Sequence, residues 1–194
     1  MAEGERGATL VELLVAMPIA ALIVASVAGM FFQLSSAHAY TTSTVQCDRE
    51  VQRAGAWVSE DAVQAQSVSD SNYSDPDTVQ IAVAQDASII GTEVFVVQWI
   101  DWNDDVRTVT YSLAPVSGST LRTLQRTVQV NGSTTDTHTA AEHIDDGTDP
   151  VALLPLTRFE WASDEKQVVR MIVTSAYGQE SVTRAYDIRP RAMV

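Results

Sequence analysis

The sequence GATLVELLVAMPIAALIVASVAGMFFQL at residues 7–34 decides how the rest of the chain is organised. No charged residue occurs between Leu13 and Phe32. An α-helix rises about 1.5 Å per residue, so a run of this length can cross a hydrocarbon core of roughly 30 Å. We therefore expect residues 8–34 to form a membrane-spanning helix.

One acidic residue, Glu12, lies at the start of this apolar run. An ionisable side chain in a spanning helix is costly, so it indicates a functional site when a partner can be named. Cleavage after Gly7 would leave a free amine on Ala8. That amine and the Glu12 carboxylate would then share one helical face, or would meet between neighbouring subunits of a staggered bundle.

These residues resemble the N-terminus of type IV prepilins and pseudopilins. The resemblance is carried by the polar leader Met1–Gly7 with its Arg6-Gly7 junction, by TLVELLV at residues 9–15, and by the apolar helix that follows. It implies that a prepilin peptidase cleaves after Gly7 and methylates the amine of Ala8. It also implies that Glu12 helps to place each subunit in a growing fibre, which an inner-membrane platform assembles.

The resemblance covers about the first fifth of the chain, and the remainder looks more loosely like minor pilins and minor pseudopilins. Pro18 lacks a backbone N–H and Gly29 is a second soft point, so we expect a kink or a looser helix there. The alternative is an ordinary signal anchor, or a secretory signal cleaved near residues 35–37. The length of the apolar run and the acid near its start argue against that alternative.

The residues after the apolar run continue the helical pattern into the aqueous phase. Small and apolar residues recur at steps of three and four along one face. The members of this stripe are Cys47, Val51, Ala54, Val58, Ala62 and Ala65. We therefore expect residues 35–66 to be the soluble half of the same helix, packed on the domain that follows, with Gly55 as its weak point.

The remaining residues, 67–194, have the pattern of a β-rich globular domain. Short apolar or alternating segments are separated by turn residues. The expected strands are 79–83, 92–100, 106–113, 120–130, 153–161, 167–176 and 180–188. The second and third should pair as a hairpin, Asn131-Gly132 is a strong turn signal, and the polar segment 133–150 is expected to be a long loop.

A long helix followed by antiparallel strands belongs to the α+β class. The resemblance implies a pilin-like version of it, in which the helix lies across the sheet. The chain has 194 residues, a net charge of −13 and one cysteine, Cys47. So acidic a body repels nucleic-acid backbones, which makes nucleic acid an unlikely partner by charge alone.

No sequence motif of an enzyme or a cofactor site is evident. The chain lacks a phosphate-binding loop, a Rossmann fingerprint, a nucleophile elbow and a zinc-protease helix. Cys47 lies on the apolar stripe, so we interpret it as a core residue rather than a nucleophile. The sequence therefore predicts a non-enzymatic protein without a cofactor.

Two groups of residues offer oxygen ligands of the kind that calcium binds. They are Asp101, Asn103, Asp104 and Asp105, and then Asp145, Asp146 and Asp149. Neither spacing matches an EF-hand loop, so we interpret both groups as solvated turn residues. A further set at helical spacing, His138, Glu142 and His143, lacks an evident fourth ligand, and we predict no metal there.

Arg184, Arg189 and Arg191 make the C-terminal end locally basic. Competence-type minor pilins use such a patch to bind DNA, as the resemblance implies. Charge on an edge strand also prevents unwanted strand pairing, and we favour this second interpretation.

The resulting hypothesis is a structural minor subunit of a type IV pilus or of a type II secretion pseudopilus. It would span the cytoplasmic membrane once, with its C-terminal domain outside the cytoplasm, and would then join other pilin or pseudopilin subunits in an extracytoplasmic fibre. The alternatives are a tip or uptake subunit that contacts DNA or a secreted substrate, and a plain membrane-anchored domain. Pilus or secretion system, and tip or shaft, stay open at this point.

Overall fold

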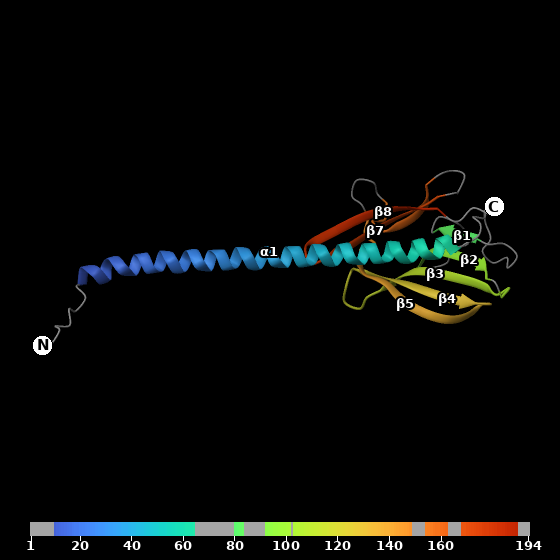
Figure 1. Ribbon diagram of the computed structural model, residues 1–194, viewed down its shortest axis with the longest axis horizontal. Helices are drawn as coiled ribbons and strands as arrows, with labels where there is room; N and C mark the ends of the chain where they lie inside the picture. The colour runs from blue at the N-terminus through green and yellow to red at the C-terminus, as the bar shows by residue number, and fades with distance from the viewer. Residues whose placement is uncertain are drawn as a thin grey trace. The chain divides into compact units, whose positions relative to one another are not determined.

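A computed structural model describes residues 10–64, 80–83, 92–101, 103–148, 154–162 and 168–189. The chain divides into two units, Met1–Thr42 and Ser43–Val194. The described part of the first unit is the N-terminal portion of helix α1 (Leu10–Gln64). The second unit holds the rest of α1 and an eight-stranded antiparallel sheet (Figure 1).

Helix α1 runs through Pro18 and Gly29 without a break in its helical assignment, so the kink expected there stays a prediction. Its hydroxyl side chains bond back to the helix itself. Ser26, Ser36 and Thr41 each donate to the carbonyl oxygen four residues earlier, at 2.8, 3.0 and 2.9 Å. Each of these three hydroxyls therefore has an acceptor within the helix and needs none from its surroundings.

The soluble half of α1 buries the predicted stripe. Cys47, Val51, Ala54, Val58 and Ala62 are each 0 % exposed, whereas Ala65 lies outside the described residues. The step of three and four residues therefore placed these side chains on the buried face, and this part of the prediction is confirmed.

The sheet contains every strand expected from the sequence and one more. Its strands are β1 (Gln80–Val83), β2 (Glu93–Ile100), β3 (Val106–Pro115), β4 (Arg122–Val130), β5 (Ser133–Ile144), β6 (Arg158–Trp161), β7 (Val169–Tyr177) and β8 (Glu180–Ile188). Their order is β1-β2-β3-β4-β5-β7-β6, and β8 pairs with β7. The two halves of the sheet meet at a single residue pair, Ile144 with Ser175.

The β2–β3 hairpin expected from the sequence is present, and Asn131-Gly132 forms a turn as expected. β2 pairs with β3 in antiparallel register, and Val109 and Tyr111 of β3 are fully buried on one face. Asn131 and Gly132 both have positive φ, 49° and 77°, and form the turn between β4 and β5. These values suit a tight hairpin turn with left-handed central residues.

The expectation of a long loop at 133–150 is wrong, because residues 133–144 form strand β5. The first six residues of β5 are exposed, so the segment shows no alternation of buried and exposed residues there. Its threonines favour a strand, but its polarity resembled that of a loop. Pairing with β4 through the Asn131-Gly132 turn decides the outcome.

The soluble half of α1 lies between β5 and β8 and bonds to both (Figure 1). On the β5 side, Arg53 donates to the Thr139 carbonyl at 3.0 Å, and Glu50 accepts from the Glu142 backbone N–H at 2.8 Å. Side chains of the helix thereby satisfy edge groups of β5 that a neighbouring strand would otherwise bind.

On the β8 side, the helix approaches closely at Gly55. The Tyr186 ring lies so near that a Cβ at Gly55 would be 2.7 Å from its Cζ atom. The Tyr186 hydroxyl donates to the Val51 carbonyl at 3.3 Å. Packing against β8 therefore requires a glycine at position 55, and this outweighs the low helix propensity of glycine.

A buried polar cluster fixes where α1 sits on the sheet. Asp61 has a side chain only 2 % exposed and binds Arg126 of β4 in a bidentate manner, with both distances 2.7 Å. The Tyr111 hydroxyl donates to the same carboxylate. Burial raises the pKa of the Tyr111 phenol, and the hydrogen bond to Asp61 raises the pKa of the Arg126 guanidinium.

Candidate functional site

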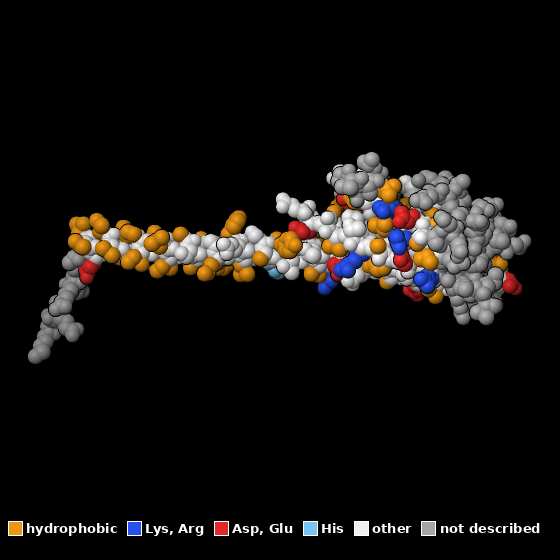
Figure 2. Space-filling model, turned by 90° about the horizontal axis from the view of Figure 1, so that it is seen from above, with side chains coloured by type: hydrophobic (Ala, Val, Ile, Leu, Met, Phe, Trp, Pro, Cys, Tyr) orange, Lys and Arg blue, Asp and Glu red, His pale blue; other side chains and the backbone are white. Residues whose placement is uncertain are grey.

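The most unusual surface of the described residues is the N-terminal part of α1. Fifteen large apolar side chains between Leu10 and Leu34 are 50–80 % exposed. They include adjacent residues such as Leu13, Leu14 and Val15, so they surround the helix instead of forming one stripe. Figure 2 shows apolar side chains along the visible face of this part.

Exposed apolar surface of this size is unfavourable in water. Burying one such side chain contributes about 1.5–3 kcal/mol, so fifteen of them correspond to a transfer free energy on the order of 20–45 kcal/mol. The helix contains an 18-residue window with a mean hydropathy of 2.5. It is thus long and apolar enough to span a membrane, and lipid or other apolar helices are the surroundings that its surface fits.

Glu12 lies in the first turn of α1 with an exposed side chain. An acid in the first turn interacts favourably with the positive end of the helix dipole. Gly7 and Ala8, the predicted cleavage junction and methylation site, lie outside the described residues. Pairing of Glu12 with the amine of Ala8 therefore stays a prediction.

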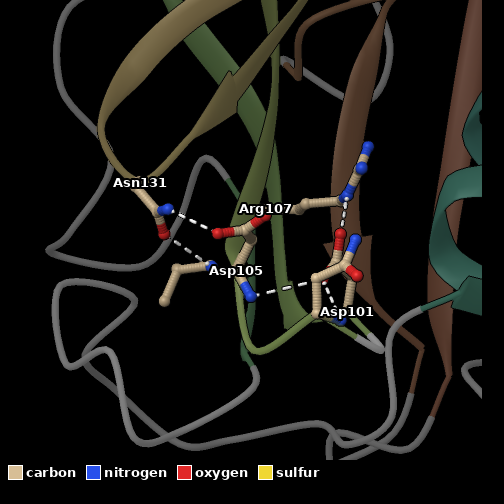
Figure 3. Close-up of polar contacts among 6 residues, drawn as sticks. Asp101, Asp105, Arg107 and Asn131 are labelled. Atoms are coloured by element: carbon tan, nitrogen blue, oxygen red, sulfur yellow. Dashed lines mark hydrogen bonds and ion pairs between the residues drawn. The ribbon is translucent and has the colours of Figure 1, made fainter.

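The residues Asp101, Asn103 and Asp105 are part of the β2–β3 hairpin tip, which Figure 3 shows in close-up. Asp101 accepts from the backbone N–H groups of Asn103 and Asp105, at 2.8 and 3.2 Å, and from Arg107 at 2.7 Å. The hydrogen bond from Arg107 lowers the pKa of Asp101. The Asp101 oxygens thus hold the turn together.

The same hairpin tip is tied to the next turn along the sheet. Asn131 donates to Asp105 at 2.7 Å and accepts from the Val106 N–H at 2.9 Å (Figure 3). Asp104, the remaining candidate, is exposed and has a φ of 62°. In the second acidic group, Asp145 accepts from the Gly147 N–H and Asp146 pairs with Arg122, whereas Asp149 lies outside the described residues.

The candidate metal set in β5 is not brought together. His138, Glu142 and His143 lie on a strand, so the helical spacing assumed for them is wrong. His138 stacks on Trp57 at 6.2 Å and pairs with Asp136 at 2.6 Å, whereas His143 packs edge-on against Tyr177. Across the described ranges, no group of three or more His, Cys, Asp and Glu side chains is placed to hold a metal ion.

The basic residues at the C-terminal end are only partly described. Arg184 binds Asp48 of α1 at 2.7 Å. Arg189 is exposed just after β8, and Arg191 lies outside the described residues. Cys47 is buried, and its thiol lies 3.8 Å from the Glu180 carbonyl, so it is placed in the core as expected.

Sequence reasoning missed the Asp61 cluster. Asp61 immediately precedes Ala62 of the apolar stripe, and its partners Tyr111 and Arg126 lie on β3 and β4. No local pattern links residues so far apart. The one available signal was a carboxylate beside the stripe in a helix expected to be half buried, which requires a cationic or hydrogen-bonding partner.

Comparisons with known proteins add no further identification. No family model, no curated protein and no solved structure matches the chain.

Proposed function

We propose that this protein is a structural minor subunit of a type IV pilus or of a type II secretion pseudopilus. The observation that carries the proposal is the exposed apolar surface of α1 between Leu10 and Leu34, which includes Glu12 in its first turn and follows a prepilin-like leader. Such a segment first spans the membrane and then packs against the equivalent helices of other subunits. The same surface suits both surroundings because each is apolar.

The N-terminal residues would act in successive steps. Prepilin peptidase cleaves after Gly7 and methylates Ala8, as the resemblance implies. The Glu12 carboxylate then neutralises the N-terminal amine of a neighbouring subunit within the apolar fibre core. A charge of either sign is costly in that core without its partner, so the pair favours one axial placement of the subunit over others.

The domain supports a role in assembly. Its antiparallel sheet is packed on the soluble half of α1, which agrees with the α+β layout of a pilin-like subunit. The Asp61 cluster, the Gly55 contact and the bonds from Arg53 and Glu50 anchor this half of the helix to the sheet. A subunit pulled by its N-terminal helix needs such an anchor.

The alternative of a DNA-binding tip subunit gains no support from the described residues. Arg184 is held by Asp48. The hydrogen bond from Arg170 lowers the pKa of Asp187, and the charge of Arg189 lowers it by a smaller amount. The charges of β8 are thus mixed in sign. A phosphate backbone is bound by clustered cations instead.

The docking role of Glu12 is tested by the substitution Glu12→Ala in the full chain. We expect the leader to be cleaved as in the wild type, and the amount of subunit in sheared fibres to fall by at least about tenfold, which corresponds to about 1.4 kcal/mol per subunit. Glu60→Ala, which removes an exposed acid from the soluble half of the same helix, should leave incorporation unchanged. Normal incorporation of the Glu12→Ala variant would contradict the docking role.

A further inference from the structure

A groove lies between the soluble half of α1 and β8. It encloses about 450 Å³ and is lined by Thr44, Val45, Asp48, Arg49, Gln52, Val182 and Arg184. We call it the α1–β8 groove. Val45 is 44 % exposed in it, whereas Cys47, two residues later and on the other side of the helix, is fully buried. The groove therefore combines apolar contact surface with charged side chains.

The charges of the α1–β8 groove do not cancel. Asp48 accepts from Gln52 at 2.7 Å and from Arg184 at 2.7 Å, so both of its oxygens are bound. Arg49 is exposed and has no hydrogen bond or ion pair to any residue that the structure describes. Two arginines against one aspartate leave the groove positive, in a chain whose net charge is −13.

Arg49 differs in this respect from most arginines of the domain. Six of them form ion pairs with carboxylates of the same chain: Arg107, Arg122, Arg126, Arg158, Arg170 and Arg184. Arg53, one helical turn after Arg49, donates to a carbonyl of β5. The guanidinium of Arg49 is therefore available to a carboxylate from outside the chain, and an Arg–carboxylate pair is strong because it is bidentate.

We propose that the α1–β8 groove binds a segment of the adjacent fibre subunit that carries a carboxylate beside an apolar side chain. The carboxylate pairs with Arg49, and the apolar side chain packs on Val45 and Val182. This inference rests on the function proposed above. The groove begins about ten residues after Leu34 on the same helix, so subunits that pack through their apolar segments bring this part of α1 near a neighbour.

Charge complementarity selects this occupant. Subunits as acidic as this one repel each other over most of their surface, and a positive groove is a place where a neighbour's acid lowers that repulsion. The groove bears a net charge of only one, which is too small to hold a nucleic-acid backbone.

The test uses the full-length protein in intact cells that assemble fibres. A photo-crosslinking benzophenone amino acid replaces Val45, and the yield of adducts to other fibre subunits is measured after irradiation. We expect Arg49→Glu to lower the yield by at least about tenfold, because an attractive pair becomes repulsive. Arg49→Lys should keep most of it, and Arg189→Glu, the same charge change on an exposed arginine outside the groove, should leave it unchanged.

The site is then confirmed by charge exchange. The crosslinked peptide is mapped, and its acidic residue is changed to lysine in the Arg49→Glu background, which should restore the adduct. The proposal is overturned if Val45 gives no adduct, if Arg49→Glu leaves the yield as it was, or if the mapped peptide contains no acidic residue. If the chain is found in fibres with a mature N-terminus but gives no Arg49-dependent adduct, this inference alone is refuted. A chain that keeps residues 1–7 and never enters fibres instead refutes the proposed function.

Discussion

Removing the arginine from the Asp61 cluster should destabilise the domain far more than removing an exposed arginine. In Arg126→Met, an unbranched apolar side chain is retained, but the guanidinium over Trp57 is lost and the Asp61 carboxylate, 2 % exposed, loses two hydrogen bonds of 2.7 Å. Of the residues that the structure describes, only Tyr111 then still binds it, through its hydroxyl. Breaking a buried ion pair in this way costs about 3–5 kcal/mol.

Two further sets of variants test the predicted loss of stability. Arg170→Met breaks an exposed pair, with side chains 42 % and 51 % exposed, and should cost less than about 1 kcal/mol. Adding Asp61→Leu to Arg126→Met removes the stranded charge, and only the buried Tyr111 hydroxyl is left unpaired, at a cost of about 1–3 kcal/mol. Adding Tyr111→Phe as well should bring the stability back near that of the wild type.

The assay is urea unfolding of the full chain in mild detergent, followed by tryptophan emission. Trp57 is a direct reporter because the Arg126 guanidinium lies 4.9 Å from its ring centroid. The expected order of stability is wild type near the triple variant, then the double variant, then Arg126→Met. A loss below about 1 kcal/mol for Arg126→Met, or losses that simply add across the series, would contradict a tightly coupled buried cluster.

Two further predictions concern the same helix and sheet. Gly55→Ala should destabilise the domain by about 1–2 kcal/mol, because its Cβ would lie 2.7 Å from the Tyr186 ring and this clash exceeds the gain of about 1 kcal/mol in helix propensity. In a Tyr186→Ala background the same change should become neutral or stabilising. A loss of stability in that background would contradict the packing argument. Burial raises the pKa of Tyr111, so above a pH of about 10 the unfolded chain releases a phenol proton that the folded chain keeps, and the free energy of unfolding should fall by up to about 1.4 kcal/mol per pH unit. Denaturation midpoints between pH 8 and 11 should show this additional slope in the wild type but not in Tyr111→Phe.

Local periodicity was sufficient to predict the elements that bury one regular face. The stripe from Cys47 to Ala62 identified the packed face of α1, and the β2–β3 hairpin followed from apolar alternation and from turn residues. Each of these features depends on residues close together in sequence, which is why pattern analysis finds them.

Features set by distant residues were not predictable in the same way. β5 begins with six exposed polar residues and becomes a strand through its pairing with β4. Gly55 is the weakest helix former of its segment, yet it is required by Tyr186, which lies more than 100 residues later in the sequence. The order of the strands, with β7 beside β5 and β6 at the end of the path, also follows from contacts across the whole domain.

The candidate functional residues were likewise predictable only where they depend on local sequence. The apolar run and Glu12 could be recognised from the sequence because the requirement of a membrane for length and hydropathy is local. The positive groove beside Arg49 could not, because it depends on β8 folding back against α1. Its charge balance becomes visible only when Asp48 is seen to be bound by Arg184.

Processing of the chain as a prepilin is best tested at its mature N-terminus. The full-length protein is produced with and without a prepilin peptidase, and its intact mass and N-terminal peptide are determined. We expect a chain that begins at Ala8 with a methylated amine, only when the peptidase is present. A chain that retains Met1 in both cells, or that begins near His38, would contradict it.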